Sequence, residues 1–465
     1  MQLAQALRLK DVGAAGPICL ALTGAGGKTT ALFRLARDLL EGETRPVLVT
    51  STTHLASEQL GLGDHHFVIK KPGDVAILEA ELLQGVILLT GPPAGAERTA
   101  GVDANSLERV RSLAQERQIP LLVEADGSRR LPLKAPAGHE PAIPAWVNTV
   151  VLVAGLSALG RPLSAEWVHR PERFAELSGL SPGAEITPAS LARVLCSQPG
   201  GLKNIPAGAR RVALLNQADT PQKQAQAFSL VKDLLVHFQA VLVAALAPPE
   251  GIEASQQEAS LLSSGPVFAA HEPVAGIILA AGASRRLGQP KQLLPWRGEP
   301  MARHVARTAL AAGLSPVVAV SGAYSEQVQA ALADLPVSQV YNPDWEAGQS
   351  TSVKAGLQAL PPETGAAVFL LVDQPQVTPN LIRSLVELHT LGLSPLVAPQ
   401  AGGRRANPVL FDRLTFPDLM SLSGDSGGRV LFSRYQAVWL PWHDESLLLD
   451  IDTPEDYQRL LELGE

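Results

Sequence analysis

The sequence is poor in three features that would each direct it to a special environment. It has only two cysteines, Cys19 and Cys196, which cannot build a disulfide framework and lack the clustered spacing of a zinc site. It has no apolar run near the roughly 20 residues that a membrane-spanning helix needs. It has no excess of positive charge, since the formal net charge is -7, and non-specific nucleic-acid binding needs a cationic surface. We therefore expect a protein of the reducing cytoplasm, with no nucleic-acid or membrane partner.

One apolar stretch imitates the core of a secretion signal. Residues 14–25 have this character, but they run directly into Gly26-Gly-Lys-Thr-Thr30, a loop that cleavage would destroy. We expect this stretch to be part of the folded chain and the protein to stay in the cytoplasm.

Apolar segments of strand length alternate with segments of helical spacing, a pattern that predicts α/β structure with parallel sheets covered on both faces. The predicted strands of the first half are residues 18–22, 47–49, 86–89, 121–123, 150–153 and 212–215. Those of the second half are residues 276–279, 317–320, 368–372, 396–398 and 437–440. Residues 248–273 between them are rich in Ser, Gln, Glu, Ala and Pro. We predict two three-layer α/β/α domains, residues 1–250 and 274–465, joined by a linker over residues 251–273.

The first predicted strand leads into a glycine-rich loop and a helix that begins near Lys28. Gly27-Lys28-Thr29 matches the end of a Walker A loop, although the first glycine of that pattern would fall at Leu22. In such a loop the lysine contacts β/γ-phosphate oxygens and the threonine hydroxyl contacts Mg²⁺. A tight strand-to-helix turn is the alternative. The residues predicted to bind nucleotide here are Gly24, Gly26, Gly27, Lys28, Thr29 and Thr30.

Two further segments of the first half fit nucleotide binding. Glu124-Ala-Asp-Gly127 follows a predicted strand and offers a Walker B-type acid, and we predict Asp126 and Thr29 as Mg²⁺ ligands. Asn216-Gln-Ala-Asp219 is similar to the guanine-reading Asn-Lys-x-Asp segment, with Gln217 in place of Lys, and we predict Asn216 and Asp219 as base contacts. These features indicate a P-loop NTPase-like domain. We favour GTP over ATP, because a carboxylate accepts hydrogen bonds from the guanine N1–H and N2–H₂ groups.

The second half opens on another glycine-rich loop, Leu279-Ala-Ala-Gly-Ala-Ser-Arg-Arg-Leu-Gly288, directly after an apolar strand. Its glycines let the backbone approach phosphate oxygens, and its arginines together with Lys291 can neutralise charge as pyrophosphate leaves. A turn with solvated basic residues is the alternative. We predict catalytic roles for Arg285 and Lys291. The predicted nucleotide-binding residues of the loop are Leu279, Ala280, Ala281, Gly282, Ser284 and Arg286.

A carboxylate follows another strand of this half. Asp373 comes directly after the predicted strand 368–372, and side chains at the carboxyl ends of parallel strands project into the crevice where open α/β sheets bind ligands. Mg²⁺ takes oxygen ligands and can bridge phosphate oxygens in triphosphate chemistry. We therefore predict Asp373 as a catalytic Mg²⁺ ligand.

The second half resembles the MobA-like nucleotidyltransferases, in particular the molybdenum cofactor cytidylyltransferase (MocA-like) branch. Beside the loop, the matching segments are Pro290-Lys-Gln-Leu-Leu-Pro295, Asn342-Pro-Asp-Trp-Glu-Ala-Gly-Gln-Ser-Thr-Ser352, Asp373-Gln-Pro375, Asn407-Pro-Val-Leu-Phe411, Gly424-Asp-Ser-Gly-Gly-Arg429 and Asp450-Ile-Asp-Thr-Pro-Glu-Asp456. Ala406 departs from the pattern, in which Gly precedes Asn-Pro. The resemblance implies a Rossmann-like fold and transfer of CMP from CTP to molybdopterin in the presence of Mg²⁺.

The resemblance also implies roles for particular residues. Asp452 would be a second Mg²⁺ ligand, although a helix N-cap is the alternative for this position. Ser350 and Ser352 would contact the nucleotide at the start of a helix predicted over residues 353–360, where an ordinary capped helix explains them equally well. Contacts to the acceptor substrate would come from Asn407, Pro408, Asp425 and Arg429, which without the resemblance would be predicted as loop residues.

The first half, over about residues 13–250, resembles the YqeC-like family, proposed accessory proteins of selenium-dependent molybdenum hydroxylases. The matching segments are Gly24-Ala-Gly-Gly-Lys-Thr-Thr30, Thr50-Ser-Thr-Thr-His54, Glu124-Ala-Asp-Gly-Ser-Arg129, Lys134-Ala-Pro136, His139-Glu-Pro141, Gly155-Leu-Ser-Ala-Leu-Gly160 and Val168-His-Arg-Pro171. His54, His139 and His169 are candidate ligands, or ordinary polar surface residues. The resemblance implies molybdenum hydroxylase apoenzymes or cofactor insertion chaperones as partners.

These observations predict a two-domain enzyme of molybdenum cofactor maturation. The C-terminal domain would transfer CMP to molybdopterin and release pyrophosphate, and the N-terminal domain would bind or hydrolyse GTP or ATP. Two alternatives stay open: a guanylyltransferase or a nucleotidyltransferase acting on another phosphate, and a nucleotide-gated cofactor chaperone that binds its ligands without turnover.

Overall fold

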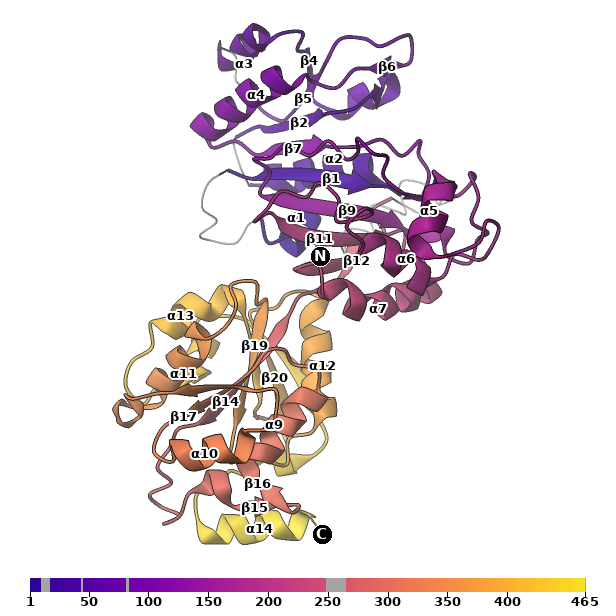
Figure 1. Cartoon of the computed structure of the whole chain (residues 1–465). Helices are drawn as coiled ribbons and strands as arrows, with labels where there is room; N and C mark the ends of the chain where they lie inside the picture. The colour runs from indigo at the N-terminus through magenta and orange to yellow at the C-terminus, as the bar shows by residue number, and fades with distance from the viewer. Residues whose placement is uncertain (10–16, 43–44, 81–82, 248–264, 465) are drawn as a thin grey trace. The chain divides into compact units, whose positions relative to one another are not determined.

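The computed structural model describes residues 1–9, 17–42, 45–80, 83–247 and 265–464 (Figure 1). The chain divides into two compact units, Met1–His271 and Glu272–Glu465. Each unit is built around its own open sheet with helices on both faces, which confirms the predicted α/β class. No helix among the described residues is long and apolar enough to cross a membrane.

The N-terminal unit contains a nine-stranded sheet of order β13-β12-β11-β9-β1-β7-β2-β5-β4. These strands are β1 (Cys19–Gly24), β2 (Val47–Ser51), β4 (His65–Val68), β5 (Val86–Thr90), β7 (Leu121–Glu124), β9 (Thr149–Gly155), β11 (Arg210–Asn216), β12 (Ala240–Ala244) and β13 (Val267–His271). Among the described strands of this sheet, only β13 is antiparallel to its neighbour. Two short pairs lie outside it: β3 (Leu55–Ala56) with β6 (Arg98–Thr99), and β8 (Leu133–Lys134) with β10 (Val168–His169).

Alternating strand residues supply a core on each face of this sheet. Along β9, Val150, Leu152 and Ala154 lie on one face and belong to two apolar clusters with residues of α4, α6 and α7, while α2 packs beside β1, β2 and β7. The helices of this unit are α1 (Leu3–Ala6), α2 (Lys28–Leu40), α3 (Ala76–Ala80), α4 (Ala104–Arg117), α5 (Pro171–Ser178), α6 (Pro188–Leu195) and α7 (Pro221–Leu235). All strands predicted in the first half are present, and no end differs from its predicted position by more than two residues.

Part of the predicted linker, residues 251–273, is a strand of the first sheet. Residues 248–264 lie outside the described residues, but Val267–His271 forms β13 and pairs with β12. The amino group of Met1 donates to the carbonyl of Val267 at 2.8 Å, which fixes the start of this strand. The boundary between the units therefore falls after His271, because the buried residues Val267, Ala269 and Ala270 complete the edge of the N-terminal sheet.

The C-terminal unit contains an eight-stranded sheet of order β18-β17-β14-β19-β22-β20-β21, with β23 paired to β20. The strands are β14 (Val274–Ala280), β17 (Val317–Ser321), β18 (Ser338–Tyr341), β19 (Ala366–Leu371), β20 (Leu396–Ala401), β21 (Arg404–Arg405), β22 (Val409–Asp412) and β23 (Ala437–Trp442). A separate hairpin joins β15 (Pro295–Trp296) to β16 (Glu299–Pro300). The sheet is mixed, because β22 runs antiparallel between β19 and β20. Residues 409–412 are therefore a central strand that the sequence analysis did not predict, and Asn407 and Pro408, expected to be loop residues on local sequence grounds, lie just before it.

Two apolar layers sandwich the C-terminal sheet. Ile278 of β14 faces the layer formed with α9, α10 and α12, while Ile277 faces the layer formed with α11 and α13. The helices are α9 (Met301–Ala311), α10 (Ser325–Leu332), α11 (Gln349–Gln358), α12 (Pro379–Thr390), α13 (Phe416–Met420) and α14 (Pro454–Gly464). Since β14, β17, β19, β20 and β23 run in one direction, their carboxyl ends form one edge, where α/β sheets bind ligands.

Candidate functional site

The loop that follows β14 is held from behind by a buried glutamine. Gln292 Nε2 donates to the carbonyl oxygens of Ala280 at 3.0 Å and Gly282 at 2.6 Å. The hydroxyl of Ser284, whose φ is 52°, accepts from the backbone N–H of Lys291 at 3.1 Å. A side chain at Gly282 would extend into open space, so the outer side of the loop backbone is accessible to a ligand. The sequence analysis did not single out Gln292, although it lies within a motif that carried the resemblance.

Two cations and two carboxylates meet beside this loop. The Lys291 ammonium forms an ion pair with Asp373, which follows β19, and lies 3.5 Å from Oδ1 of Asp452, which precedes α14. Arg286 Nη1 lies 3.0 Å from the other carboxylate oxygen of Asp452. The structure thus brings together four predicted site residues from three distant parts of the sequence. Carboxylate oxygens at the carboxyl edge of the sheet are suitable ligands for Mg²⁺, and substrate phosphates would supply its remaining ligands.

The remaining predicted residues of the loop surround this array. Leu279 and Ala280 are the last residues of β14, and the side chain of Ala281 is buried. Arg285 projects into solvent, with Nη2 at 3.6 Å from Glu346 Oε1 and both side chains exposed. An exposed pair of this kind contributes little to stability, so Arg285 is available to an anionic ligand.

A third carboxylate lies behind the first two. Gln374 Nε2 donates to Asp450 Oδ1 at 2.6 Å. Burial raises the pKa of Asp450, and the negative charges of Asp373 and Asp452 raise it further. No group of three or more His, Cys, Asp or Glu in the described part of the chain is arranged to hold a metal ion on its own. Asp373 and Asp452 are therefore the residues that would hold Mg²⁺, with Asp450 shaping the charge around them.

The start of α11 is tied to neighbouring segments. Asn342 Nδ2 donates to the hydroxyls of Thr351 at 2.8 Å and Ser352 at 3.0 Å. The side chains of Ser350 and Ser352 are both buried. The hydroxyls of Ser350 and Ser352 were predicted to contact a nucleotide. In the structure the Ser352 hydroxyl accepts from Asn342 and so holds the turn that precedes α11. A nucleotide would meet the backbone of this segment more readily than these hydroxyls.

Two glycines bring the start of α11 against the segment 424–429. At Gly348, with φ 113°, an added Cβ would lie 2.4 Å from the backbone of Gly424. The N–H of Ser350 donates to the Gly424 carbonyl at 3.3 Å, and the N–H of Gln349 donates to Asp425 Oδ1 at 3.3 Å. The segments predicted to contact nucleotide and acceptor therefore touch each other.

The predicted acceptor residues lie around one edge of the sheet. The peptide bond between Asn407 and Pro408 is cis and leads into β22, and Ala406 is buried with its N–H bonded to the Pro399 carbonyl at 3.0 Å. The exposed Arg429 begins the turn that follows Gly428. The burial of Arg405, and then the positive charge of Arg429, lower the pKa of Arg405. Arg405 stacks 4.5 Å over the ring of Phe432 and is a cation that the sequence analysis missed.

In the N-terminal unit, glycines shape the loop between β1 and α2. Gly24, Gly26 and Gly27 have φ values of 92°, 81° and 117°, which favour glycine over every other residue. A Cβ at Gly26 would lie 2.4 Å from the backbone of Gly155, and a Cβ at Gly27 would lie 2.4 Å from the Asn216 amide nitrogen. The loop therefore passes tightly beside two other strand ends, as a phosphate-binding turn does before a helix.

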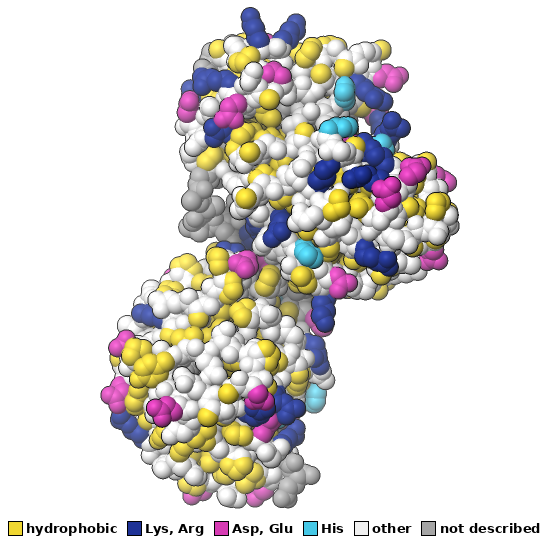
Figure 2. Space-filling view, viewed as in Figure 1, with side chains coloured by type: hydrophobic (Ala, Val, Ile, Leu, Met, Phe, Trp, Pro, Cys, Tyr) yellow, Lys and Arg dark blue, Asp and Glu magenta, His cyan; other side chains and the backbone are white. Residues whose placement is uncertain are grey.

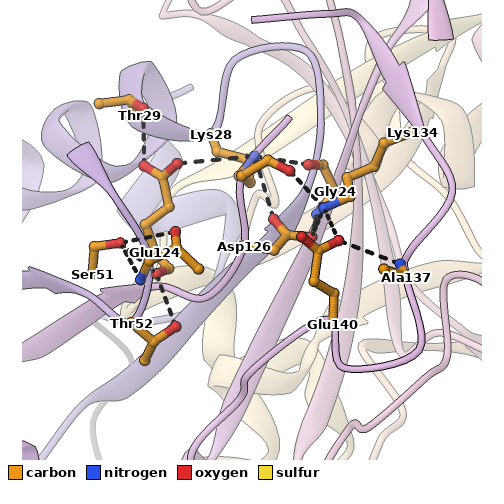
Figure 3. A network of polar contacts seen from close by, with 12 residues as sticks. Gly24, Lys28, Thr29, Ser51, Thr52, Glu124, Asp126, Lys134, Ala137 and Glu140 are labelled. Atoms are coloured by element: carbon orange, nitrogen blue, oxygen red, sulfur yellow. Dashed lines mark hydrogen bonds and ion pairs between the residues drawn. The ribbon is translucent and has the colours of Figure 1, made fainter. Parts of the chain in front are cut away.

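The lysine of this loop is enclosed by acids (Figure 3). Lys28 Nζ donates to the Gly24 carbonyl at 2.8 Å and lies 3.3 Å from Asp126 Oδ1 and 3.9 Å from Glu124 Oε1. The Thr29 hydroxyl donates to Glu124 Oε2 at 2.9 Å, and burial raises the pKa of Glu124. Glu124, rather than the predicted Asp126, is thus the acid beside Thr29. These two residues are the oxygen donors that would fit Mg²⁺ here.

The predicted base-reading residues separate in the structure. Asn216 is buried, donates to the Gly26 carbonyl at 2.7 Å and accepts from the N–H of Leu246 at 3.0 Å, so its amide supports the loop. Asp219 is paired with Lys223 at 2.7 Å on the first turn of α7. Only Asp219 has a side chain that a base could reach. Thr30, also predicted, is exposed on α2.

Comparisons with known proteins agree with this division into two units. The family model described as the MobA-like NTP transferase domain matches residues 276–438, and that described as the YqeC protein matches residues 20–172. YqeC of Escherichia coli (strain K12) is 35% identical over 229 residues, which cover 49% of this chain and 87% of that protein. The chain belongs to the YqeC family in its first unit and to the MobA-like NTP transferases in its second.

Two further relatives match the MobA-like unit. Nicotine blue oxidoreductase of Paenarthrobacter nicotinovorans is 38% identical over 200 residues, covering 40% of this chain and 96% of the relative. Molybdenum cofactor cytidylyltransferase of Escherichia coli (strain K12) is 27% identical over 184 residues, covering 39% of this chain and 92% of the relative. The MobA-like unit is a nucleotidyltransferase, as the sequence analysis predicted.

In the YqeC unit, the family segments converge beside the loop of residues 24–30. Lys134 Nζ lies 2.9 Å from both Asp126 Oδ2 and Glu140 Oε2 and donates to the Gly127 carbonyl at 2.6 Å. Arg170 binds Glu140 through both terminal nitrogens, at 2.8 and 3.1 Å. Of the three candidate histidines, only His169 lies in this network, because β10 places it opposite Lys134 of β8. Residues from four separate motifs therefore form one continuous polar cluster.

Proposed function

We propose that the MobA-like unit transfers CMP from CTP to the terminal phosphate of molybdopterin. The array of Lys291, Asp373, Asp452 and Arg286 beside the Gly282 loop supports this proposal most directly. The loop backbone would cradle the triphosphate, and Asp373 and Asp452 would hold Mg²⁺. At these carboxylates Mg²⁺ would supply positive charge that stabilises the departing pyrophosphate.

The reaction needs no protein nucleophile. An oxygen of the acceptor phosphate attacks the α-phosphorus of CTP, the bond from that phosphorus to the bridging oxygen breaks, and pyrophosphate leaves with the bonding electrons. The chain's own residues orient the reactants and balance charge. Lys291 and Arg285 would lie against the leaving phosphates. Asn407, Pro408, Asp425 and Arg429 would position the acceptor.

We further propose that the YqeC unit binds a purine nucleoside triphosphate at Gly24–Thr30, with GTP preferred through Asp219. The proposed partners of the whole chain are molybdenum hydroxylase apoenzymes or cofactor insertion chaperones, which would receive the dinucleotide cofactor. Lys28 and the pair Thr29–Glu124 support this second proposal, since they supply the cation and the oxygen ligands that a Mg²⁺-bound triphosphate requires.

The decisive experiment measures pyrophosphate release by the full chain with molybdopterin and each of CTP, GTP, ATP and UTP in Mg²⁺. We expect release with CTP, dependent on molybdopterin. Release with GTP alone would identify a guanylyltransferase, and release with another phosphorylated acceptor would redirect the substrate assignment. Stoichiometric binding of CTP and molybdopterin without release would indicate a chaperone and contradict the proposal.

A further inference from the structure

A chain of ion pairs leads from the phosphate loop of the YqeC unit to a second group of cations. Lys28 lies 3.3 Å from Asp126, and Asp126 lies 2.9 Å from Lys134. Lys134 lies 2.9 Å from Glu140, which Arg170 binds at 2.8 Å. The side chains of Lys28, Asp126 and Lys134 are each 2% exposed, so this part of the chain is fixed inside the unit. Figure 3 shows Asp126 lying between the two lysines.

The outer end of this chain carries unbalanced positive charge. Glu140 is shared by Lys134 and Arg170, whose hydrogen bonds and charges outweigh its burial and lower its pKa to about 2. The positive charge of Arg129 reaches this region, where it contributes to lowering the pKa of His169. The Arg129 side chain is exposed and has no hydrogen bond or ion pair among the described residues. Figure 2 shows Lys and Arg side chains gathered with His side chains on the visible face of the N-terminal unit, beside α5. Lys134 is shared between Asp126 and Glu140, Arg170 is paired with Glu140, and the positive charge of Arg129 is left without an ion-pair partner among the described residues.

His169 lies within this group of cations. Its backbone carbonyl accepts from the N–H of Ala135 at 3.1 Å, and the β8–β10 register sets it beside Lys134. The charged groups that face it are Arg170, Lys134 and Arg129, with Glu140 as the opposing charge. Burial first, and then these three cations, lower the pKa of His169 to about 4. The imidazole is thus neutral at physiological pH in a site that attracts anions.

We propose that His169, Arg129 and Arg170 form a second anion site of the YqeC unit, which holds the phosphate group of a second substrate. The site is separate from the triphosphate loop, because Asp126 and Glu140 stand between Lys28 and Arg170. One phosphate could not contact both cations without displacing a buried, paired carboxylate. The proposal goes beyond nucleotide binding and does not depend on CMP transfer. It gives the YqeC unit two phosphorylated ligands at neighbouring positions.

Binding at this site is linked to proton uptake. A dianion beside His169 offsets the charges of Arg170, Lys134 and Arg129, so it raises the pKa of the imidazole towards its ordinary value. A protonated His169 in turn gains a second donor for the anion. The ligand should therefore bind more tightly as the pH falls from about 7 to about 5.

The test uses the full chain, with ¹³Cε1-histidine labelling and sulfate as the probe, since sulfate stays a dianion throughout. The His169 signal, assigned by its loss in His169→Gln, is followed between pH 5 and 7.5 in sodium sulfate and in sodium chloride of equal ionic strength. We expect a titration in sulfate that chloride does not produce. Identical behaviour in the two salts would mean general screening and would overturn the proposal.

Variants separate this site from the phosphate loop. Arg129→Gln should weaken the sulfate response of His169 about tenfold, because a charge-assisted hydrogen bond is lost. Arg117→Gln removes an exposed arginine at the end of α4 and should change nothing. Lys28→Ala should leave the response in place even if nucleotide binding is lost. A response that survives Arg129→Gln and disappears in Lys28→Ala would place the anion in the phosphate loop and refute the second site.

Discussion

Lys291 and Asp373, which lie 82 residues apart in the sequence, form an ion pair at the carboxyl edge of the MobA-like sheet. The lysine thus neutralises the carboxylate that is proposed to hold Mg²⁺. The ammonium contacts Oδ2 of Asp373, so a metal ion held by this carboxylate would compete with it, and Lys291 would then be available to the phosphates. The pair connects metal binding with the placement of a cation on the leaving group.

Asp373→Asn should reduce CMP transfer more than Asp452→Asn. Asp373 is the less exposed of the two carboxylates and has the closer contact to Lys291, while Asp452 is shared with the exposed Arg286. Loss of a metal ligand removes several kcal/mol of transition-state stabilisation. We expect turnover to fall at least about 100-fold for Asp373→Asn at saturating Mg²⁺. For Asp452→Asn we expect mainly a higher Mg²⁺ requirement.

Glu363→Gln is the matched control for these two variants. Glu363 is exposed and has no hydrogen bond or ion pair among the described residues, so the variant removes one negative charge without altering the site. Steady-state rates over a Mg²⁺ titration distinguish the outcomes. Full activity of Asp373→Asn at limiting Mg²⁺ would exclude this residue as a ligand.

Asn216 and Asp219 should have separable effects on nucleotide binding by the YqeC unit. Asn216→Ala removes the amide that holds the Gly26 carbonyl and should weaken GTP and ATP binding equally, through the shape of the loop. Asp219→Asn should weaken GTP binding selectively, since the carboxylate would accept from guanine. Titration of the full chain with both nucleotides checks this, in a background of Lys291→Ala that suppresses binding to the transferase loop. Equal losses for Asp219→Asn would refute guanine reading.

The N-terminal fragment should need β13 for full stability. A fragment of residues 1–271 keeps the strand that covers the edge of β12, whereas a fragment of residues 1–250 exposes that edge and loses the buried side chains of Val267, Ala269 and Ala270. We expect the midpoint of thermal unfolding to be at least about 5 °C lower for the shorter fragment. Scanning calorimetry measures both. Equal midpoints would show that β13 adds nothing to the fold.

The N-terminal unit should lose stability in mild acid through His271. Burial lowers the pKa of this imidazole to about 4, so the unfolded chain takes up a proton first as the pH falls. Its contribution is fully present above about pH 6.5 and is lost between there and about pH 4, up to about 3 kcal/mol. His271→Phe should make this part of the pH profile in urea unfolding shallower, with a remaining slope from His169, whose pKa is also lowered to about 4. His139→Phe, which changes an exposed histidine, should leave the slope unchanged.

Local sequence patterns predicted the fold where strand and helix signals are strong. Each apolar run of the first half became a strand, because buried parallel strands need continuous apolar residues. The prediction failed where pairing depends on distant partners. Val409–Asp412 follows a cis peptide bond and is a strand only because β19 and β20 flank it. In the same way, β13 became visible only through its pairing with β12.

The site residues show the same division. The sequence motifs predicted that Lys291 and Asp373 serve the same reaction. No sequence pattern indicated that their side chains form an ion pair. The sequence could not decide whether Glu124 or Asp126 lies beside Thr29, because both acids come at the end of the same strand. The structure places Glu124 against the Thr29 hydroxyl and Asp126 against Lys134. The sequence did not indicate Arg405 as a site residue, because its neighbours in the structure, Arg429 and Phe432, come from a segment more than 20 residues away.

The contact between Gly348 and Gly424 has a kinetic consequence. A nucleotide bound as proposed at the start of α11 would also immobilise the loop at Asp425, since hydrogen bonds join the two segments and leave no room for a side chain at Gly348. The entropy cost of ordering that loop would then fall on nucleotide binding, so the acceptor would bind to a loop that is already ordered. Substrate addition should therefore follow a fixed sequence, with the nucleotide entering first. A methyl group at Gly348 would separate the two loops and make the order of entry random.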